Sequence, residues 1–220
     1  WARITKDRYG ANDPQAMRLR FHTQTLGSTL VRQGPKNNIV RGTVQALAGV
    51  LGGTQSLHVS GYDEAYDIPS EDAMRVSLAT QLVLASETGV ASTIDPLAGS
   101  YFVEHLTNQL EEEAWEYIRK LDGMGDGSIL QGMLAAIDSG YIESEIARAA
   151  YEYQRRVENR EYVVVGLNGY ESEEAAPLEL YEHDPREEER QLEALEQVRR
   201  TRDSDRVERA TDALRRAAEE

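Results

Sequence analysis

The chain has 220 residues, of which 40% are hydrophobic and 29% charged, and its formal net charge is −15 at pH 7. This composition is typical of a water-soluble globular protein, and the acidic balance excludes the basic surface that nucleic-acid binding requires. Because there is no cysteine, disulfides, cysteine-ligated zinc, iron–sulfur clusters and a thiolate nucleophile are excluded as well.

The sequence shows no membrane or targeting signal. Its longest apolar stretches fall far below the ~20 residues that cross a bilayer, and its first residues lack the apolar segment of a secretory signal. We therefore expect a cytoplasmic protein with no membrane contact. The first residue is Trp1, in what reads as a helix, so the sequence is expected to begin inside a domain.

Lysine is rare among the 24 basic residues, at positions 6, 36 and 120 only. An acidic composition poor in lysine is typical of proteins adapted to high salt, where self-repulsion is screened. A GC-rich genome favours arginine regardless of salt, and the sequence leaves both explanations open.

Residues 18–51 predict a strand followed by a helix. Residues 18–24 alternate apolar and polar side chains, which is the pattern of a strand. After a glycine-containing turn, Asn38 is expected to cap a helix over residues 39–51, where apolar side chains recur at helical spacing. Gly52 and Gly53 are expected to end this helix.

The same order repeats immediately afterwards. Residues 54–59 predict a second strand, residues 60–69 a loop, and Ser70 the cap of a helix that ends at Gly89. Strand and helix alternating across glycine-rich joints predict an α/β fold with a parallel sheet covered by helices. Two such units fit the last part of a (β/α)8 barrel or a doubly wound sheet, and periodicity alone does not decide between them.

Beyond residue 92 the predicted elements are mainly helical. Helices are expected over residues 101–121, 129–137 and 144–156, with a flexible glycine-rich turn at 123–127 and an isolated apolar strand at 162–166. The strongly acidic residues 171–220 contain helical runs at 185–202 and 205–218. We therefore expect βα units in residues 1–92, a helical segment with one short strand in 93–170, and an acidic helical linker in 171–220.

Polar side chains gather on the two predicted strands. His22 and Gln24 end the first strand, and Gln55, Ser56 and His58 lie on the second. Parallel α/β folds place ligand sites at strand ends, and amides or a neutral imidazole can hydrogen-bond a thioester without changing charge. A lone histidine is more often a satisfied interior group, but two polar clusters at one sheet end favour a binding site.

Two acids follow the second strand, at Asp63 and Glu64. A carboxylate in this loop can bind a ribose hydroxyl or act as a base, although such pairs are most often solvated. The spacings of metal-ligating motifs, of a P-loop and of a dinucleotide-binding glycine loop do not occur. We therefore expect no metal ligand in this chain.

An ordered set of short strings resembles the large, substrate-binding subunit of the methylmalonyl-CoA mutase family. The strings are RFHTQTLG at residues 20–27, NNIVR at 37–41, GGTQSLH at 52–58, DEA at 63–65 and DPLAGSY at 95–101. GMG at 123–125 and VGLNGY at 165–170 look like the family's GGM and VGVNKY segments, with departures at Asp126 and Gly169. The resemblance covers essentially the whole chain, and its order makes it far more specific than any single motif.

The resemblance implies the C-terminal portion of a (β/α)8 TIM barrel followed by a mainly helical linker. It also implies adenosylcobalamin as cofactor at the barrel's mouth and an acyl-CoA threaded along its axis. By matched position, the implied catalytic residues are His22 and Gln24, the implied cofactor-binding residues are Gln24, Gly27, Glu64, Ala65 and Ile68, and the implied substrate-binding residues are His22, Gln55 and Ser56.

The family's DxHxxG motif, whose histidine ligates cobalt, is absent from this sequence. The resemblance therefore implies that cobalamin is held by a further domain or by a small subunit, in a dimer or heterodimer.

The reaction implied is radical isomerisation of an acyl-CoA, with (R)-methylmalonyl-CoA to succinyl-CoA as the first choice. Ethylmalonyl-, isobutyryl- and 2-hydroxyisobutyryl-CoA stay open, because the residues that select the acyl group are expected upstream. A catalytically silent partner subunit would be expected to lose site residues that are retained here, such as His22 and Glu64. A plain scaffold would explain the acidic tail but not the polar strand ends.

Overall fold

The computed structural model describes residues 1–172 and 178–219. The chain divides into two compact units, Trp1–Tyr181 and Glu182–Glu220. The first unit contains a small parallel sheet among several helices, and the second unit is helical. Across the described ranges, no helix is both long and apolar enough to cross a membrane.

Two short strands form a parallel sheet, β1 (His22–Gln24) and β2 (Ser56–His58). His22 pairs with Ser56 and Gln24 with His58. The strands are shorter than the predicted residues 18–24 and 54–59. Strand pairing needs hydrogen-bonded neighbours, and in the described residues each of these strands has the other as its one partner.

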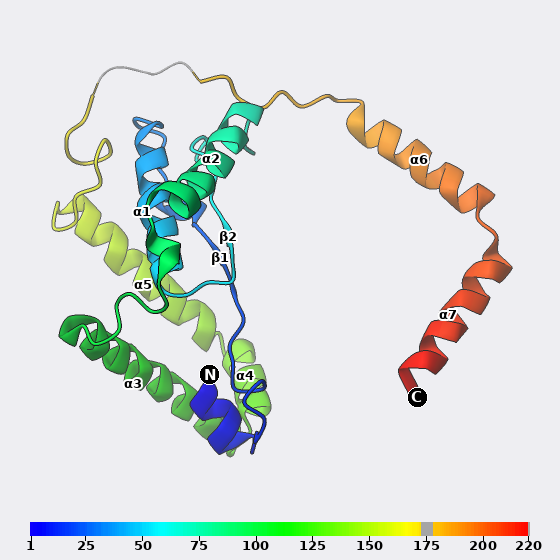
Figure 1. Ribbon diagram of the computed structural model, residues 1–220, viewed down its shortest axis with the longest axis horizontal. Coiled ribbons are helices and arrows are strands. Elements are labelled where there is room, and N and C mark those ends of the chain that lie inside the picture. The colour runs from blue at the N-terminus through cyan, green and yellow to red at the C-terminus, as the bar shows by residue number, and fades with distance from the viewer. Residues whose placement is uncertain (173–177, 220) are drawn as a thin grey trace. The chain divides into compact units, whose positions relative to one another are not determined.

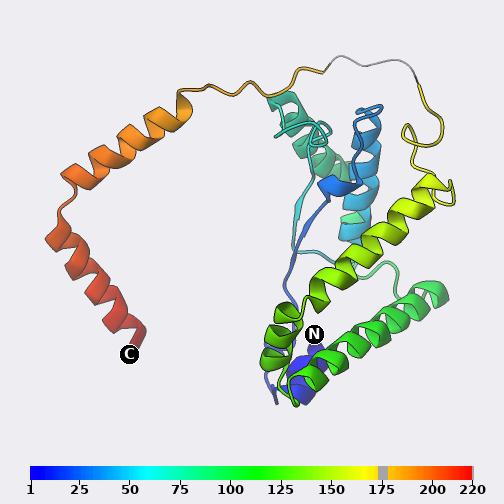
Figure 2. The ribbon, with the colours of Figure 1, turned by 180° about the vertical axis from the view of Figure 1, so that it is seen from behind.

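Helix α1 (Asn37–Leu51) connects the two strands, and helix α2 (Glu71–Glu87) follows β2. Helix α1 packs against both strands and α2 against β2, on the same side of the strand pair in Figure 1 and in Figure 2. The predicted order of strand, helix, strand and helix is therefore confirmed. Ala46, Val59 and Leu84 form the buried core between these elements, with Leu47 and Leu57 packed against it.

Close packing of α1 on the strands depends on a helical glycine. A Cβ added at Gly49 would lie 3.0 Å from Cγ2 of Thr23 in β1. Such a contact is too tight for an unaltered structure, so the glycine sets how closely helix and strand approach.

The two predicted helix caps have different outcomes. Ser70 caps α2 as predicted, since its Oγ accepts a hydrogen bond from the backbone N–H of Ala73 at 3.3 Å. Asn38 is wrong as a cap because α1 begins one residue earlier, at Asn37, and the residue before it makes no side-chain cap. The Asn38 side chain is buried, with a relative exposure of 2%, and its amide is engaged elsewhere.

Three helices follow: α3 (Tyr101–Met124), α4 (Ile129–Asp138) and α5 (Tyr141–Glu158). α3 packs against α4, and α4 against α5. The glycine-rich segment predicted as a flexible turn is a close backbone crossing. A Cβ at Gly125 would lie 2.8 Å from the Cα of Gly132, and a Cβ at Gly132 would lie 2.6 Å from the carbonyl carbon of Leu121.

The predicted strand at residues 162–166 is wrong. Its one ladder contact is an isolated bridge between Val165 and Gly169. Asn168 holds the segment as a turn instead: its amide donates to the carbonyls of Val157 at 2.7 Å and Tyr162 at 2.8 Å, and its Oδ1 accepts from the N–H of Val164 at 2.7 Å. One side chain thus supplies the hydrogen bonds that a neighbouring strand would otherwise provide.

The start of the chain is tied to α3. Residues Ile4–Arg8 form a π-helical turn, and the Arg8 guanidinium donates two hydrogen bonds to the Asp122 carboxylate, at 2.9 and 2.5 Å. This bidentate pair holds the pKa of Asp122 below its usual range, because Arg8 donates hydrogen bonds to the charged form.

The second unit consists of α6 (Glu187–Thr201) and α7 (Ser204–Glu219), which confirms the two helices predicted in the acidic tail. Neither helix contains a buried residue. The predicted boundaries at residues 92 and 170 stay predictions.

Candidate functional site

The face of the strand pair turned away from the core is polar. Alternation along a strand places His22 and Gln24 of β1 on one face, beside Ser56 and His58 of β2. His22, Gln24 and Ser56 are exposed and His58 is half-buried, whereas Leu57 of the other face packs on the core. The sequence prediction that these polar groups lie together is therefore confirmed.

At the beginning of the strands, the residues expected to bind substrate lie together. The His22 Nδ1 and the Ser56 Oγ are 2.7 Å apart, and they are hydrogen-bonded. The Gln55 amide connects the segments that lead into the two strands. Its Oε1 accepts from the N–H of Phe21, before β1, at 2.7 Å, and its Nε2 donates to the carbonyl of Gly53, before β2, at 2.6 Å. Gln55 therefore fixes the approach to both strands, while the imidazole and hydroxyl remain on the exposed face.

Past the ends of the strands, the two segments of the chain stay joined by hydrogen bonds that involve the side chains of Thr25 and Ser60. Thr25 and Ser60 are both buried. The Ser60 N–H donates to Thr25 Oγ1 at 2.8 Å, and the Ser60 hydroxyl donates to the Thr25 carbonyl at 2.7 Å. Ser60 is the donor in both hydrogen bonds, which hold together the starts of the two loops that follow, at residues 25–36 and 59–70.

Asn38 clamps the same two loops further out. Its amide donates to the carbonyl of Val31 in the first loop and to the carbonyl of Tyr62 in the second, both at 2.9 Å. Its Oδ1 accepts from the Val31 N–H at 3.3 Å and from the Arg41 guanidinium at 2.7 Å. A buried amide with every one of these bonds made is costly to replace, because each lost partner is left unpaired.

A second clamp lies between Tyr66 and Arg32. The Tyr66 hydroxyl donates to the carbonyl of Arg32 at 2.6 Å, and the Arg32 guanidinium lies 5.0 Å from the centre of the Tyr66 ring. The loop after β2 is thereby tied to the loop after β1 at a second point.

The clamped loops bring Gly27 against Glu64. A Cβ added at Gly27 would lie 3.1 Å from Cδ of Glu64 and closer still to its Oε1. Within residues 1–172 and 178–219, no hydrogen bond or ion pair engages the Gln24 amide or the Glu64 carboxylate. The structure therefore brings Gly27 and Glu64 together at the end of the polar face, with two polar groups that have no internal partner there.

The remaining residues expected at the cofactor site lie in the loop after β2. Ala65 is half-buried and Ile68 is exposed. Asp63 is buried, with a relative exposure of 1%, and its Oδ2 accepts from the N–H of Ser70 at 2.9 Å. Asp63 thus pins the loop that presents Glu64 and Ala65, whereas the sequence suggested a solvated carboxylate.

An adjacent tyrosine shows how this loop is anchored to α2. The Tyr62 hydroxyl donates to the Asp72 carboxylate at 2.8 Å. That hydrogen bond, with partial burial and the nearby negative charges, raises the pKa of Tyr62 to about 12. Tyr62 therefore stays neutral at physiological pH and acts as a fixed donor.

Sequence reasoning missed the groups that hold the site. Thr25 and Asn38 stand inside two of the strings that resemble the family, but nothing in those strings or around Ser60 and Tyr66 indicates their clamping roles, because their partners lie on other segments. The one signal that could have indicated these roles is a polar residue at a position that packing buries, and only the structure shows which positions are buried. By contrast, the exposed groups themselves were found, because they follow strand periodicity.

The chemistry on offer is positioning rather than nucleophilic attack. The face presents two imidazoles, an amide and a hydroxyl, with the Glu64 carboxylate at its end, and such groups hydrogen-bond a ligand without reacting with it. In the part of the chain that the structure describes, no cluster of three or more His, Asp or Glu is arranged to hold a metal ion. Parallel strands covered by helices, with a polar face that leads to the loops after the strands, are typical of the class of α/β proteins whose ligand sites lie at strand ends.

Comparison with known proteins identifies the family within that class. The methylmalonyl-CoA mutase family model matches residues 1–220. The 2-hydroxyisobutanoyl-CoA mutase large subunit of Aquincola tertiaricarbonis is 42% identical over 215 residues, which cover 97% of this chain and 37% of that protein.

Two bacterial methylmalonyl-CoA mutases are also similar. That of Rhizobium meliloti (strain 1021) is 40% identical over 97% of this chain, and that of Escherichia coli (strain K12) is 38% identical over 96%. The match covers 29% of each of these two proteins, so the chain spans about a third of the length of its relatives. The chain belongs to the methylmalonyl-CoA mutase family.

Proposed function

We propose that this chain is part of the substrate-binding subunit of an adenosylcobalamin-dependent acyl-CoA mutase. The observation that carries the proposal is the continuous polar face from His22 and Ser56 to Gln24, which ends at the contact between Gly27 and Glu64. Membership of the family supports the reaction class.

In the complete enzyme, β1 with α1 and β2 with α2 are the last two βα units of a (β/α)8 barrel. Each strand has one partner in the described residues, so each carries an open edge that a barrel would pair with a neighbour. The polar face then turns inward, while α1 and α2 lie on the outside.

The acyl-CoA substrate lies along this inward face. His22 and Ser56 are both exposed, so either can turn from their shared hydrogen bond to the thioester oxygen without leaving a buried group unpaired. Gln55 holds the segments before the two strands in place through its hydrogen bonds to the backbone of Phe21 and Gly53. These three residues bind and orient the substrate.

The residues at the end of the face fit a nucleoside-bearing cofactor. Gly27 leaves space where any Cβ would meet the Glu64 carboxylate, and that carboxylate is suited to accept hydrogen bonds from ribose hydroxyls. Gln24, on the same face, orients the reacting part of the cofactor, and Ala65 and Ile68 supply apolar contact from the next turn of the loop.

When bound, adenosylcobalamin supplies the homolytic chemistry that amides, hydroxyls and carboxylates cannot perform. The residues of this chain hold the acyl group and the adenosyl group together and keep water away from them. Cobalt is held by a cobalamin-binding domain or small subunit, and the assembly is a dimer or heterodimer. Relatives from Aquincola tertiaricarbonis and Porphyromonas gingivalis are named as large subunits.

The proposed reaction is the conversion of (R)-methylmalonyl-CoA to succinyl-CoA, which agrees with the names of most of the relatives given above. A second candidate is a 2-hydroxyisobutanoyl-CoA rearrangement, because a protein named for that substrate is 42% identical to this chain.

The experiment supplies the complete enzyme and its cobalamin-binding partner with adenosylcobalamin and one acyl-CoA at a time. The panel is methylmalonyl-, ethylmalonyl-, isobutyryl- and 2-hydroxyisobutyryl-CoA, and products are identified by mass spectrometry and NMR. We expect cofactor-dependent rearrangement of methylmalonyl-CoA. Rearrangement of 2-hydroxyisobutyryl-CoA alone would select the second candidate, and no rearrangement of any of the four would refute the mutase assignment.

A further inference from the structure

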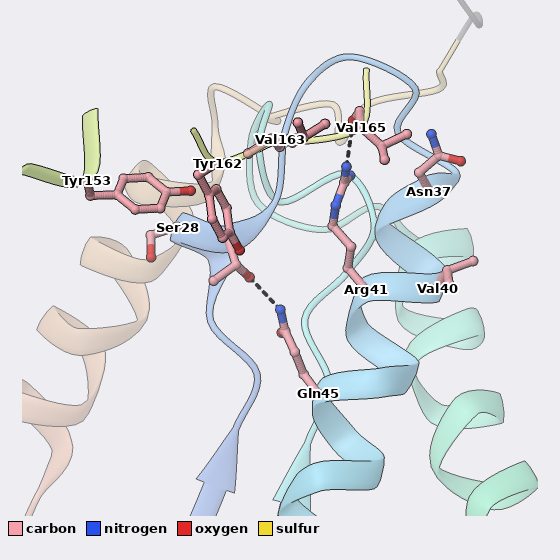
Figure 3. Close-up of a pocket in the computed structure, with 11 residues that line it drawn as sticks. Ser28, Asn37, Val40, Arg41, Gln45, Tyr153, Tyr162, Val163 and Val165 are labelled. Carbon is pink, nitrogen blue, oxygen red and sulfur yellow. Dashed lines mark hydrogen bonds between the residues drawn. The ribbon is translucent and has the colours of Figure 1, made fainter. Parts of the chain in front are cut away.

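A cavity of about 670 Å³ lies away from the polar strand face. Its walls are the first turns of α1, the loop after β1, and the segment from Tyr153 of α5 to Val165 (Figure 3). This volume lies within the range of small-molecule sites. The proposed substrate and cofactor residues do not line it, so the mutase function leaves it unexplained.

Arg41 is the charged residue in the described lining, and no acidic side chain accompanies it there. Its guanidinium donates to Oδ1 of Asn38 and to the carbonyl of Val165, each at 2.7 Å. Both partners are neutral, so they orient the guanidinium without cancelling its charge. In a chain of net charge −15, a cavity with a positive charge and no acid is a selective environment for an anion.

Two tyrosines form the wall opposite α1 (Figure 3). The rings of Tyr153 and Tyr162 are 5.6 Å apart between centres and tilted by 57°. The Arg156 guanidinium lies 5.8 Å from the centre of the Tyr162 ring and helps to fix it. A flat ring or an apolar chain can pack against this wall.

The floor of the cavity carries an unused acceptor. Gln45 Nε2 donates to Thr29 Oγ1 at 2.8 Å, whereas Gln45 Oε1 is buried and has no hydrogen-bond partner in the described part of the chain. A buried acceptor without a donor is unfavourable. Gln45 lines the cavity, so a small rotation of its amide would bring Oε1 to the O–H or N–H of a ligand, which would supply a hydrogen bond that the described part of the chain does not make.

We propose that this cavity binds a small organic monoanion, a carboxylate with a flat or apolar body and one O–H or N–H donor. The carboxylate meets Arg41, the body packs on Tyr153 and Tyr162, and the donor reaches Gln45. One guanidinium compensates one negative charge, so a phosphate dianion would leave excess charge in a partly enclosed site.

The test is calorimetric titration of the complete enzyme with 4-hydroxybenzoate, which combines the three features. The neutral 4-hydroxybenzyl alcohol and inorganic phosphate serve as comparison probes. We expect saturable binding of 4-hydroxybenzoate, at least about tenfold tighter than either comparison, since a charge-assisted hydrogen bond contributes about that factor or more. No binding of 4-hydroxybenzoate, or equal binding of the neutral alcohol or of phosphate, would overturn the proposal.

Two variants with the same added charge locate the site. Gln45→Glu keeps the size of the floor residue but places a negative charge opposite the anion, and should weaken 4-hydroxybenzoate binding at least about tenfold. Ala48→Glu adds the same charge on an exposed position of α1 outside the lining, and should leave binding unchanged. Equal effects of the two would place the binding elsewhere. The titration needs no turnover, so it is independent of the mutase proposal.

Discussion

Gly27 and Glu64 come from loops after different strands, yet the glycine lies so close to the carboxylate that a Cβ would be 3.1 Å from Glu64 Cδ. The hydrogen bonds of Asn38 and Ser60 hold both loops, so the close approach depends on how the backbone of the two loops is placed and not only on the Glu64 side chain. The contact defines the proposed cofactor end of the polar face.

Gly27→Ala should therefore displace the Glu64 carboxylate and weaken adenosylcobalamin binding to the complete enzyme. Misplacement of this kind costs on the order of 10²-fold in rate, and titration with the cofactor and turnover both report it. Gly123→Ala is the matched control, because a Cβ at Gly123 meets nothing within 4 Å. Equal affinity and turnover in the two variants would remove the proposed role of the contact.

Loss of the Asn38 clamp should destabilise the protein. Asn38→Ala leaves the carbonyls of Val31 and Tyr62 and the N–H of Val31 without their partner, which is expected to cost about 2–4 kcal/mol in the free energy of unfolding. Chemical denaturation of the complete subunit measures it. The exposed neighbour provides a control as Asn37→Ala, and a loss below ~0.5 kcal/mol for Asn38→Ala would show that the clamp is unimportant.

Gln24→Ala and Glu64→Ala are expected to lower turnover on the order of 10²-fold. The fold should stay intact, because neither side chain is buried and neither makes a hydrogen bond or ion pair in the described residues. Steady-state kinetics and thermal unfolding separate the two effects. Glu87→Ala, an exposed acid at the end of α2, is the control. Normal turnover in both site variants at saturating cofactor would refute their assignment.

The Arg8–Asp122 pair predicts a pH dependence of stability. Because Arg8 lowers the pKa of Asp122 in the folded state, the pair stabilises the protein above the ordinary carboxyl pKa of about 3.9, and this contribution is lost as pH falls through the lowered value. The difference in Tm between wild type and Arg8→Gln should be constant near neutral pH and should disappear in acid.

Arg3→Gln is the control for this titration, since Arg3 pairs with Glu111 at the surface and exposed pairs contribute little. A Tm difference for Arg8→Gln that persists at acid pH would mean that the Arg8 side chain stabilises by packing rather than through the Asp122 carboxylate.

Local signals in the sequence predicted the elements whose causes are local. The Ser70 cap, the helical spacing of residues 39–51 and the alternation of strand and helix were all visible, and all are present. The polar face was also predictable, because strand alternation places His22 and Gln24 together whatever lies around them.

Features that depend on distant partners were not predictable. Asn38 has the composition of a helix cap, and only the positions of Val31 and Tyr62 turn it into a buried clamp. The valines at 163–165 have the composition of a strand, but Asn168 satisfies the backbone locally. Strand length likewise depends on neighbours, which periodicity cannot supply.

The most direct test of the central claim follows hydrogen through the proposed site. The complete enzyme, its cobalamin-binding partner and adenosylcobalamin are incubated with methylmalonyl-CoA deuterated on the methyl group, and the recovered cofactor is analysed by mass spectrometry. We expect deuterium in the adenosyl group together with labelled succinyl-CoA, and much less of both in Gln24→Ala. Rearranged product without any deuterium in the adenosyl group would contradict this expectation.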